Sequence, residues 1–380
     1  MNDKVNKKVL AFSGICAIVF AICALLIGIL ELAVAGMKND LEFLEAGERW
    51  SSDGERFAVI TMYSEDSSGV TADQAESWVN RIDTALLNSS VSPKHERARS
   101  WTYTYMAEDN LRITGPMSSC SAEVTAAGGD FFVFHQMQFK YGSPFLNDKS
   151  SPMGVVIDRD LAWKLFGAEN IVGMTVTISD IEYTVVGVVE KESDSGTYSE
   201  TYGDSPRMYM SYAGYIKAAG DGNHITMFET ALPNAVKGFA MNIFTGAVSF
   251  NEDTAELIEA TDRFSLANRF NNMKTLKYSW IRENKIEYPY WENEAKVCDY
   301  FSAVMMIFEV SLAAVCVSAF VVSFITFRMS GYTVTDSVKN IWHRVEPKIE
   351  KHRRNKKERI RKTKNKPVQR MKQIGSKPKE

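Results

Sequence analysis

The segment that decides the fold runs from Arg159 to Glu190 and reads RDLAWKLFGAENIVGMTVTISDIEYTVVGVVE. Asp158 or Asp160 can cap a helix through LAWKLF, and Gly167 is the residue type that ends helices. The second half alternates apolar and polar side chains in two runs that meet near Ser179, which predicts a β-hairpin. A short helix followed by a hairpin indicates a mixed domain of helices and strands, and the flanking segments indicate where that domain lies.

Two uncharged apolar segments flank the domain. Val9–Leu30 spans about 33 Å as a helix, enough for a bilayer core of about 30 Å. Val310–Phe327 spans about 27 Å, which is short but sufficient with aromatic ends. Lysines precede the first segment, and Arg328 with a basic tail follows the second. Because positive flanks stay in the cytoplasm, both termini are expected there and the region between the segments outside.

These segments give the expected domain boundaries. We expect a cytoplasmic N-terminus at 1–8, a first transmembrane helix at 9–35, an extracytoplasmic domain at 36–300, a second transmembrane helix at 301–328 and a basic cytoplasmic tail at 329–380. The chain is then a two-pass protein of the cell membrane, in contact with the lipid bilayer.

Charge is distributed unevenly along the chain. The net charge is −3, yet Lys339 to Glu380 contains 17 Lys and Arg against 4 Asp and Glu. Such a tail is expected to be disordered, or helical only where it meets anionic lipid. We expect no nucleic-acid binding, because no aromatic residues alternate with the basic ones.

The sequence leaves open whether the N-terminal helix is cleaved and whether a disulfide forms. AVAG at 33–36 resembles a signal-peptidase site, but the preceding apolar run exceeds the usual core of about 7–15 residues, which favours an uncleaved anchor. Cys120 and Cys298 are the external cysteines, and either one disulfide or two free thiols would fit.

The expected extracytoplasmic domain contains two similar units of strand and helix. Residues 36–50 are expected to continue the first membrane helix as a stalk, and 55–64 and 71–90 are expected to be a strand and a helix. A second unit follows later in the chain, in which 251–266 is expected to be helical. The fold class is therefore α+β, with a porter-like α/β subdomain interrupted by an inserted, mainly β subdomain at about 130–215.

The segment GGDFFVFHQMQFKYGSPF, with MGVVIDRDLAWKLFG and the hairpin that follow it, resembles the periplasmic core domain of MacB-type ABC transporter permeases. The resemblance is specific in order and spacing over about 60 residues. The positions that carry it are Phe131, Phe132, Phe134, Gly142, Phe145, Leu161, Ala162, Leu165, Phe166, Gly167, Gly173, Tyr183, Val186, Gly187 and Val188.

The resemblance implies a two-part exterior domain that works with a nucleotide-binding subunit. It also implies handling of exported peptides, antimicrobials or lipoproteins. Such permeases have four membrane helices, whereas this sequence shows two, and Gly331 to Asn340 lacks the usual coupling motif. The chain would then be half of a split permease, a shortened relative that acts with a full one, or a module without a transport role.

Motifs for catalysis are absent from the sequence. It contains no P-loop, no GxSxG, no HExxH and no dinucleotide-binding glycine run, so we expect no enzyme activity, no metal and no cofactor on this chain. ATP is expected on the partner subunit. The aromatic residues of the family segment, with Trp163, fit a core better than a ligand groove.

Two carboxylates lie at the outer ends of the apolar runs. Glu31 and Glu309 either sit in water at the headgroup level or contact a partner helix or a cationic substrate. Pro289 to Trp291 is expected to be an aromatic anchor at the membrane interface.

The preferred function is a permease-like component of an ABC-type export or mechanotransmission complex. Its partners would be an ABC ATPase subunit and, in one version, a full permease subunit. The alternative is a membrane-anchored module that binds or scaffolds a ligand without transporting it.

Overall fold

The computed structural model describes residues 2–51, 54–92, 99–145, 152–191, 201–220, 224–276, 285–329 and 346–347. The basic tail therefore lies almost wholly outside the described residues. The chain divides into two compact units. One comprises the residues up to Ile27 and from Ser311 onward, and the other runs from Gly28 to Val310.

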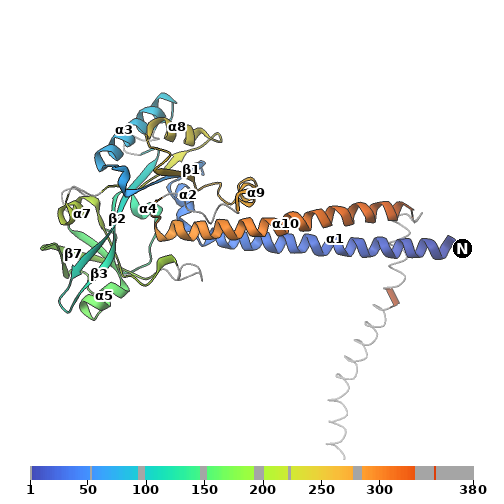
Figure 1. Ribbon diagram of the computed structural model, residues 1–380, viewed down its shortest axis with the longest axis horizontal. Coiled ribbons are helices and arrows are strands. Elements are labelled where there is room, and N and C mark those ends of the chain that lie inside the picture. Colours follow the sequence, from blue (N-terminus) through green and yellow to red (C-terminus); the bar gives the residue numbers. More distant parts are fainter. Residues whose placement is uncertain are drawn as a thin grey trace, which may run out of the picture. The chain divides into compact units, whose positions relative to one another are not determined.

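The elements alternate between helices and strands in the second unit (Figure 1). In chain order they are α1 (Asn2–Asn39), η1 (Glu42–Glu45), α2 (Ala46–Trp50), β1 (Phe57–Ser64), η2 (Asp66–Ser68), α3 (Ala72–Asn88), β2 (Thr102–Thr114), β3 (Ser119–Gly129), α4 (Phe131–Phe134), β4 (Phe139–Gly142), β5 (Gly154–Asp158), α5 (Arg159–Phe166), β6 (Thr175–Ile178), β7 (Ile181–Val189), β8 (Arg207–Ser211), α7 (Tyr212–Ala219), β9 (Met227–Pro233), α8 (Phe239–Ala247), β10 (Ala255–Glu259), α9 (Leu266–Thr275) and α10 (Tyr290–Met329).

The first unit contains parts of two candidate membrane helices, α1 and α10, and the second unit contains the rest of both. Their apolar side chains are mostly exposed, as expected for helices that face lipid. Ser13 and Ser323 tie them together: each hydroxyl donates to the other residue's carbonyl oxygen, at 3.0 and 3.1 Å. Because hydrocarbon supplies no other partner, such hydrogen bonds hold paired membrane helices in one register.

A single sheet of ten strands organises the second unit, which is a mixed α+β domain between two long apolar helices. The order is β10-β1-β9-β2-β3-β8-β5-β7-β4, and β6 pairs with β2 and β7. For reference we call β10-β1-β9-β2 with α3 and α8 the porter half of this sheet. We call the strands from β3 to β4 in the sheet order, with α5 and α7, the inserted half (Figure 1). The long β2–β3 hairpin joins the two halves.

The sheet is covered on both faces. In β1 the side chains of Ala58, Ile60 and Met62 pack in the core under α3 and α8, whereas Val59 and Tyr63 pack in a second core on the opposite face. This alternation follows from the two-residue period of a strand. The second core contains α2, α4 and the start of α10, so it is the core that connects the domain to the long helices.

Local signals set several element ends as the sequence predicts. Asp158 caps α5 by accepting a hydrogen bond from Leu161 N at 2.7 Å, and Gly167 ends that helix at φ 65°. Ser179 and Asp180 both have positive φ, the geometry of a tight hairpin turn between β6 and β7.

Two expected elements differ from the structure. The stalk does not stay helical, because α1 ends at Asn39 and the next residues turn back: Leu41, Phe43 and Leu44 are buried in the second core. Residues 251–266 are not one helix, because Ala255–Glu259 pairs with β1 as the edge strand β10. In both places tertiary packing outweighs the local helical preference.

The buried cap Asp158 makes domain stability depend on pH. Burial raises the pKa of this carboxyl from 3.8 to about 6, although backbone donors from Leu161 and Arg207 oppose the shift. The folded state therefore favours the protonated form. The stabilisation is complete below pH 4 and is lost as pH rises through 6, by up to about 3 kcal/mol.

We expect Asp158→Asn, the neutral isostere, to remove this pH dependence. The difference in unfolding free energy, wild type minus variant, should fall between pH 4 and pH 7, as measured by thermal unfolding at intervals across that range. A difference that is constant with pH would show that the Asp158 pKa is not raised. The exposed carboxylate variant Asp204→Asn is the control.

Candidate functional site

Buried charges join the long helices to the sheet, and these charges are the candidate functional site. They belong to the second unit, which includes the outer part of α1 from Gly28 and the first part of α10 up to Val310. We call residues 290–299 the α10 base.

Arg269 links both long helices to α9. Its Nη1 donates to Glu31 Oε2 of α1 at 3.0 Å, and its Nη2 donates to Glu309 Oε1 of α10 at 2.6 Å. The arginine side chain is 1% exposed, and the carboxylates are 43% and 6% exposed. Glu309 is therefore removed from water, Glu31 stays partly in water, and the cation that both contact comes from this chain.

Arg263, just before α9, holds the α10 base. Its guanidinium donates two hydrogen bonds to Glu292, at 2.8 and 2.9 Å, and Nε donates to Asp299 at 2.7 Å. Tyr63 of β1 donates its hydroxyl to the same Glu292 at 3.2 Å. A two-pronged arginine–carboxylate pair is stronger and more directional than a single contact. The porter half is thus joined to α10 by several directional hydrogen bonds.

The protonation of this cluster reflects its burial. Burial acts to lower the pKa of Arg263, but Glu292 and Asp299 raise that pKa above its ordinary value. Burial raises the pKa of Asp299 to about 6, against the opposing charge of Arg263. Burial and then the Glu292 charge raise the pKa of Tyr63 well above 10, so this hydroxyl stays a donor.

A further buried carboxylate lies within the sheet itself. Glu229 of β9 is fully buried, accepts a hydrogen bond from Thr61 at 3.1 Å and contacts His135 Nε2 at 2.9 Å. The His135 ring lies against Trp291 of the α10 base, with ring centroids 4.2 Å apart. Trp291 is 2% exposed, so the expected interfacial anchor is instead part of the domain core.

The inserted half contacts the same helix base. The Arg207 guanidinium of β8 lies 4.6 Å from the ring centroids of both Tyr202 and Tyr290, in a cation–π arrangement. It also pairs with Glu123 at 2.6 Å. The α10 base is therefore held by the porter half through Arg263 and by the inserted half through Arg207.

The residues that carry the family resemblance serve packing. Phe131 and Phe134 are buried in α4, and the Phe132 ring packs on Phe139 and Phe145. Leu161 and Ala162 are fully buried on α5, with the partly buried Phe166 packed against the same core. Trp163 is exposed.

The family glycines allow close backbone contacts. Gly142 has φ 75°, and a Cβ there would lie 2.0 Å from the carbonyl oxygen of Val186. Gly173 also has a positive φ, and a Cβ on Gly187 would lie 2.7 Å from the Phe139 ring. These glycines let neighbouring backbone segments of the inserted half pack closely. The sequence pattern that identifies them does not identify Arg263, Arg269 or Glu229.

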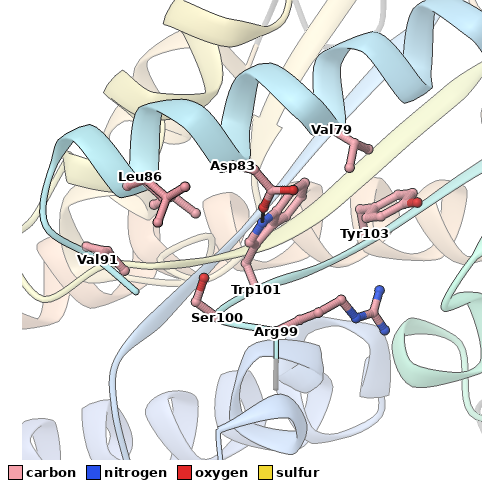
Figure 2. Close-up of a pocket in the computed structure, with 9 residues that line it drawn as sticks. Val79, Asp83, Leu86, Val91, Arg99, Ser100, Trp101 and Tyr103 are labelled. Carbon is pink, nitrogen blue, oxygen red and sulfur yellow. Dashed lines mark hydrogen bonds between the residues drawn. The ribbon is translucent and has the colours of Figure 1, made fainter. Parts of the chain in front are cut away.

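A pocket of about 320 Å³ lies beside α3 and the start of β2. Figure 2 shows Asp83 bonded to the Trp101 indole, and this N–H···O distance is 2.6 Å. Arg99 at the rim pairs with Asp130. Since these polar groups already bind each other, the pocket offers mainly an apolar wall and is a weaker candidate than the buried charges.

Other chemistry is not supported among the described residues. No group of three or more His, Cys, Asp or Glu side chains could hold a metal there. All five cysteines are free thiols, so Cys120 and Cys298 do not pair. Burial raises the pKa of Cys298 to about 12, which makes it an unreactive thiol.

Comparison with known proteins gives one family. The model for the MacB-like periplasmic core domain matches residues 11–259. No curated protein matches the chain.

Three solved structures are similar at low identity. The periplasmic region of MacB from Actinobacillus actinomycetemcomitans is 17% identical, covering 53% of this chain and 88% of that one, with a TM-score of 0.37. The extracellular domain of the noncanonic ABC-type transporter YknZ from Gram-positive bacteria is 12% identical, covering 53% and 99%, with a TM-score of 0.36. A domain of a putative permease protein from Porphyromonas gingivalis is 15% identical, covering 54% and 90%, with a TM-score of 0.31.

Proposed function

Because this chain belongs to the MacB-like periplasmic core domain family, we propose that it is a permease-like membrane component of an ABC-type export or mechanotransmission complex. A separate ATPase subunit binds ATP and supplies the motion, since this chain has no P-loop. The chain itself has a mechanical role and catalyses no reaction.

The proposed placement follows the charge of the flanks. Helices α1 and α10 cross the cell membrane, the termini are cytoplasmic, and the domain at about 36–300 lies outside. The basic tail contacts anionic lipid on the inner leaflet, near where an ATPase would bind.

One observation carries the mechanism: a single buried arginine bonds both long helices. Because Arg269 contacts Glu31 and Glu309 together, a change in the spacing of the helix ends must break one ion pair or move α9. Glu309 is 6% exposed, so leaving it without Arg269 would cost about 3–5 kcal/mol, and moving this helix end together with α9 is the cheaper response.

The α10 base carries that movement into the domain. Arg263 ties this base to the porter half, and Arg207 packs its start against the inserted half. A tilt of α10 therefore acts on both halves at once and shifts one against the other across the β2–β3 hairpin. A substrate held by the outer surface would be displaced by this shift.

The proposal is tested by isolating the full chain from its native membranes in mild detergent. We expect an ABC ATPase to co-purify, with further membrane helices supplied by a second permease subunit, and deletion of the chain to reduce export. Recovery of the chain alone, together with normal export after deletion, would contradict the proposal and favour a module that binds or scaffolds without transport.

Arg269→Lys tests the mechanism within the assembled complex. Lysine keeps the charge but has one compact ammonium group, so it cannot bond two carboxylates in the fixed fork of arginine. We expect export to fall by about tenfold or more, a loss of about 1.4 kcal/mol in coupling, while assembly and ATP hydrolysis persist.

The matched control is Arg159→Lys, because that side chain is 42% exposed and pairs with Glu190 at the surface. It should leave both export and ATP hydrolysis unchanged. Equal export by the Arg269 and Arg159 variants would show that the Arg269 bridge does not transmit motion.

A further inference from the structure

Helix α9 has two opposite faces. At about 100° per residue, Leu266, Phe270 and Met273 fall within one arc of about 60°. The opposite side of the helix is polar and consists of Asn268, Asn271, Asn272 and Thr275. Leu266 is 64% exposed and Phe270 is 40% exposed, so the apolar arc is not covered by the domain.

The position of α9 relative to the bilayer is fixed by Arg269. This residue bonds Glu31 and Glu309, which directly adjoin the uncharged runs Val9–Leu30 and Val310–Phe327. In the proposed membrane crossing these carboxylates mark the outer edge of the hydrocarbon. Helix α9 therefore lies beside α10 at headgroup level (Figure 1).

The long helices also expose apolar side chains at the level of α9. Next to the two carboxylates, Leu32 is 73% exposed and Phe308 is 59% exposed. Lys274 borders the arc, with its ammonium 4.5 Å from the centroid of the Phe270 ring. An apolar stripe edged by a cation that can reach phosphate is the pattern of helices that lie in a membrane interface.

We propose that α9 is an interfacial helix that inserts Leu266 and Phe270 into the outer leaflet and binds a lipid phosphate through Lys274. The inference rests on the proposed membrane crossing of α1 and α10. Its consequence is that the Arg269 bridge reports the state of the lipid surface to the domain as well as the spacing of the two helices.

Spin labels in the full chain show whether lipid, water or protein contacts the apolar arc. With the five native cysteines replaced by alanine, Phe270→Cys on the apolar arc and Asn271→Cys on the polar side are labelled and reconstituted in vesicles of phosphatidylethanolamine and phosphatidylglycerol. We expect the ratio of oxygen to nickel-complex accessibility to be several-fold higher at 270 than at 271.

Two further measurements separate the alternatives. Ile18→Cys, at an exposed position in the middle of α1, reports membrane crossing by itself. Lys274→Glu should lower the ratio at 270, and lower it more as the phosphatidylglycerol content rises. Each labelled chain is first checked for a protease-resistant domain.

The outcomes are distinct. A lipid-exposed label at 18 with a water-exposed label at 270 would overturn the interfacial helix and leave the membrane crossing intact. A label at 270 that is shielded from both reagents would show that a protein covers α9, which also overturns the proposal. Water exposure at 18 would overturn the proposed crossing itself.

Discussion

Replacing Arg263 with methionine is expected to destabilise the domain by about 3–5 kcal/mol, because the buried carboxylate of Glu292 would lose its partner. Glu292 is 1% exposed and Asp299, the second partner, also lies in the cluster. Thermal unfolding of the full chain in detergent measures the effect, and a fall in the midpoint of about 10 °C is expected for a domain of this size.

Two variants show that the effect arises from the uncompensated charge. Arg159→Met removes an exposed arginine from a surface pair and should cost less than about 1 kcal/mol. The double variant Arg263→Met with Glu292→Leu removes both charges of the two-pronged pair and leaves only Asp299 without its partner, so it should recover part of the loss. If the single and double Arg263 variants are equally unstable, lost packing rather than the buried carboxylate explains the effect.

Replacing Trp291 with alanine is expected to cost about 3–5 kcal/mol, because the ring is 2% exposed and its removal leaves a cavity in the second core. The ring packs on His135 and on Tyr290, whose centroid is 4.9 Å away. The loss should appear in thermal unfolding and as earlier proteolysis near the α10 base.

The chain offers matched controls for this substitution. Trp163→Ala removes a tryptophan that is 52% exposed, and its cost should be within about 1 kcal/mol. Trp291→Phe keeps most of the ring and removes an indole N–H that has no hydrogen-bond partner among the described residues, so it should cost less than the alanine variant. A small loss for Trp291→Ala would show that this side chain contributes little to the second core.

Local chemistry made much of the fold predictable. The cap at Asp158, the stop at Gly167 and the turn at Ser179 each depend on residues within a few positions, and the structure contains all three. The two apolar helices were equally clear, because length and hydropathy alone identify them. The Thr71 cap of α3, with Gln74 returning the hydrogen bond, belongs to the same class of signal.

Elements that depend on distant partners were not predictable in this way. Residues 255–259 are too few to show a period, and their pairing with β1 decides that they form a strand. The break after Asn39 likewise depends on a core for Leu41 that other segments build. In each case the deciding contact lies far along the chain, where sequence pattern carries no information.

The candidate site shows the same limit more strongly. Glu31 and Glu309 stood out because carboxylates beside apolar runs are rare, but their partner Arg269 lies 238 and 40 positions away from them. Nothing local marks Arg269 as buried, since the residues around it in α9 are mostly polar. The local pattern that α9 does show is its arc of apolar side chains, formed by Leu266, Phe270 and Met273.

The Arg269 bridge also bears on the order of events during synthesis. The chain leaves the first long helix at Asn39 and reaches the second at Tyr290, so everything between them forms one closed loop. Closing a flexible loop of that length would cost several kcal/mol of chain entropy. Folding of the domain already closes this loop, so the two helix ends come within reach of one guanidinium without a further loss of that chain entropy. Formation of the Arg269 bridge therefore depends on folding of the domain between the two helices.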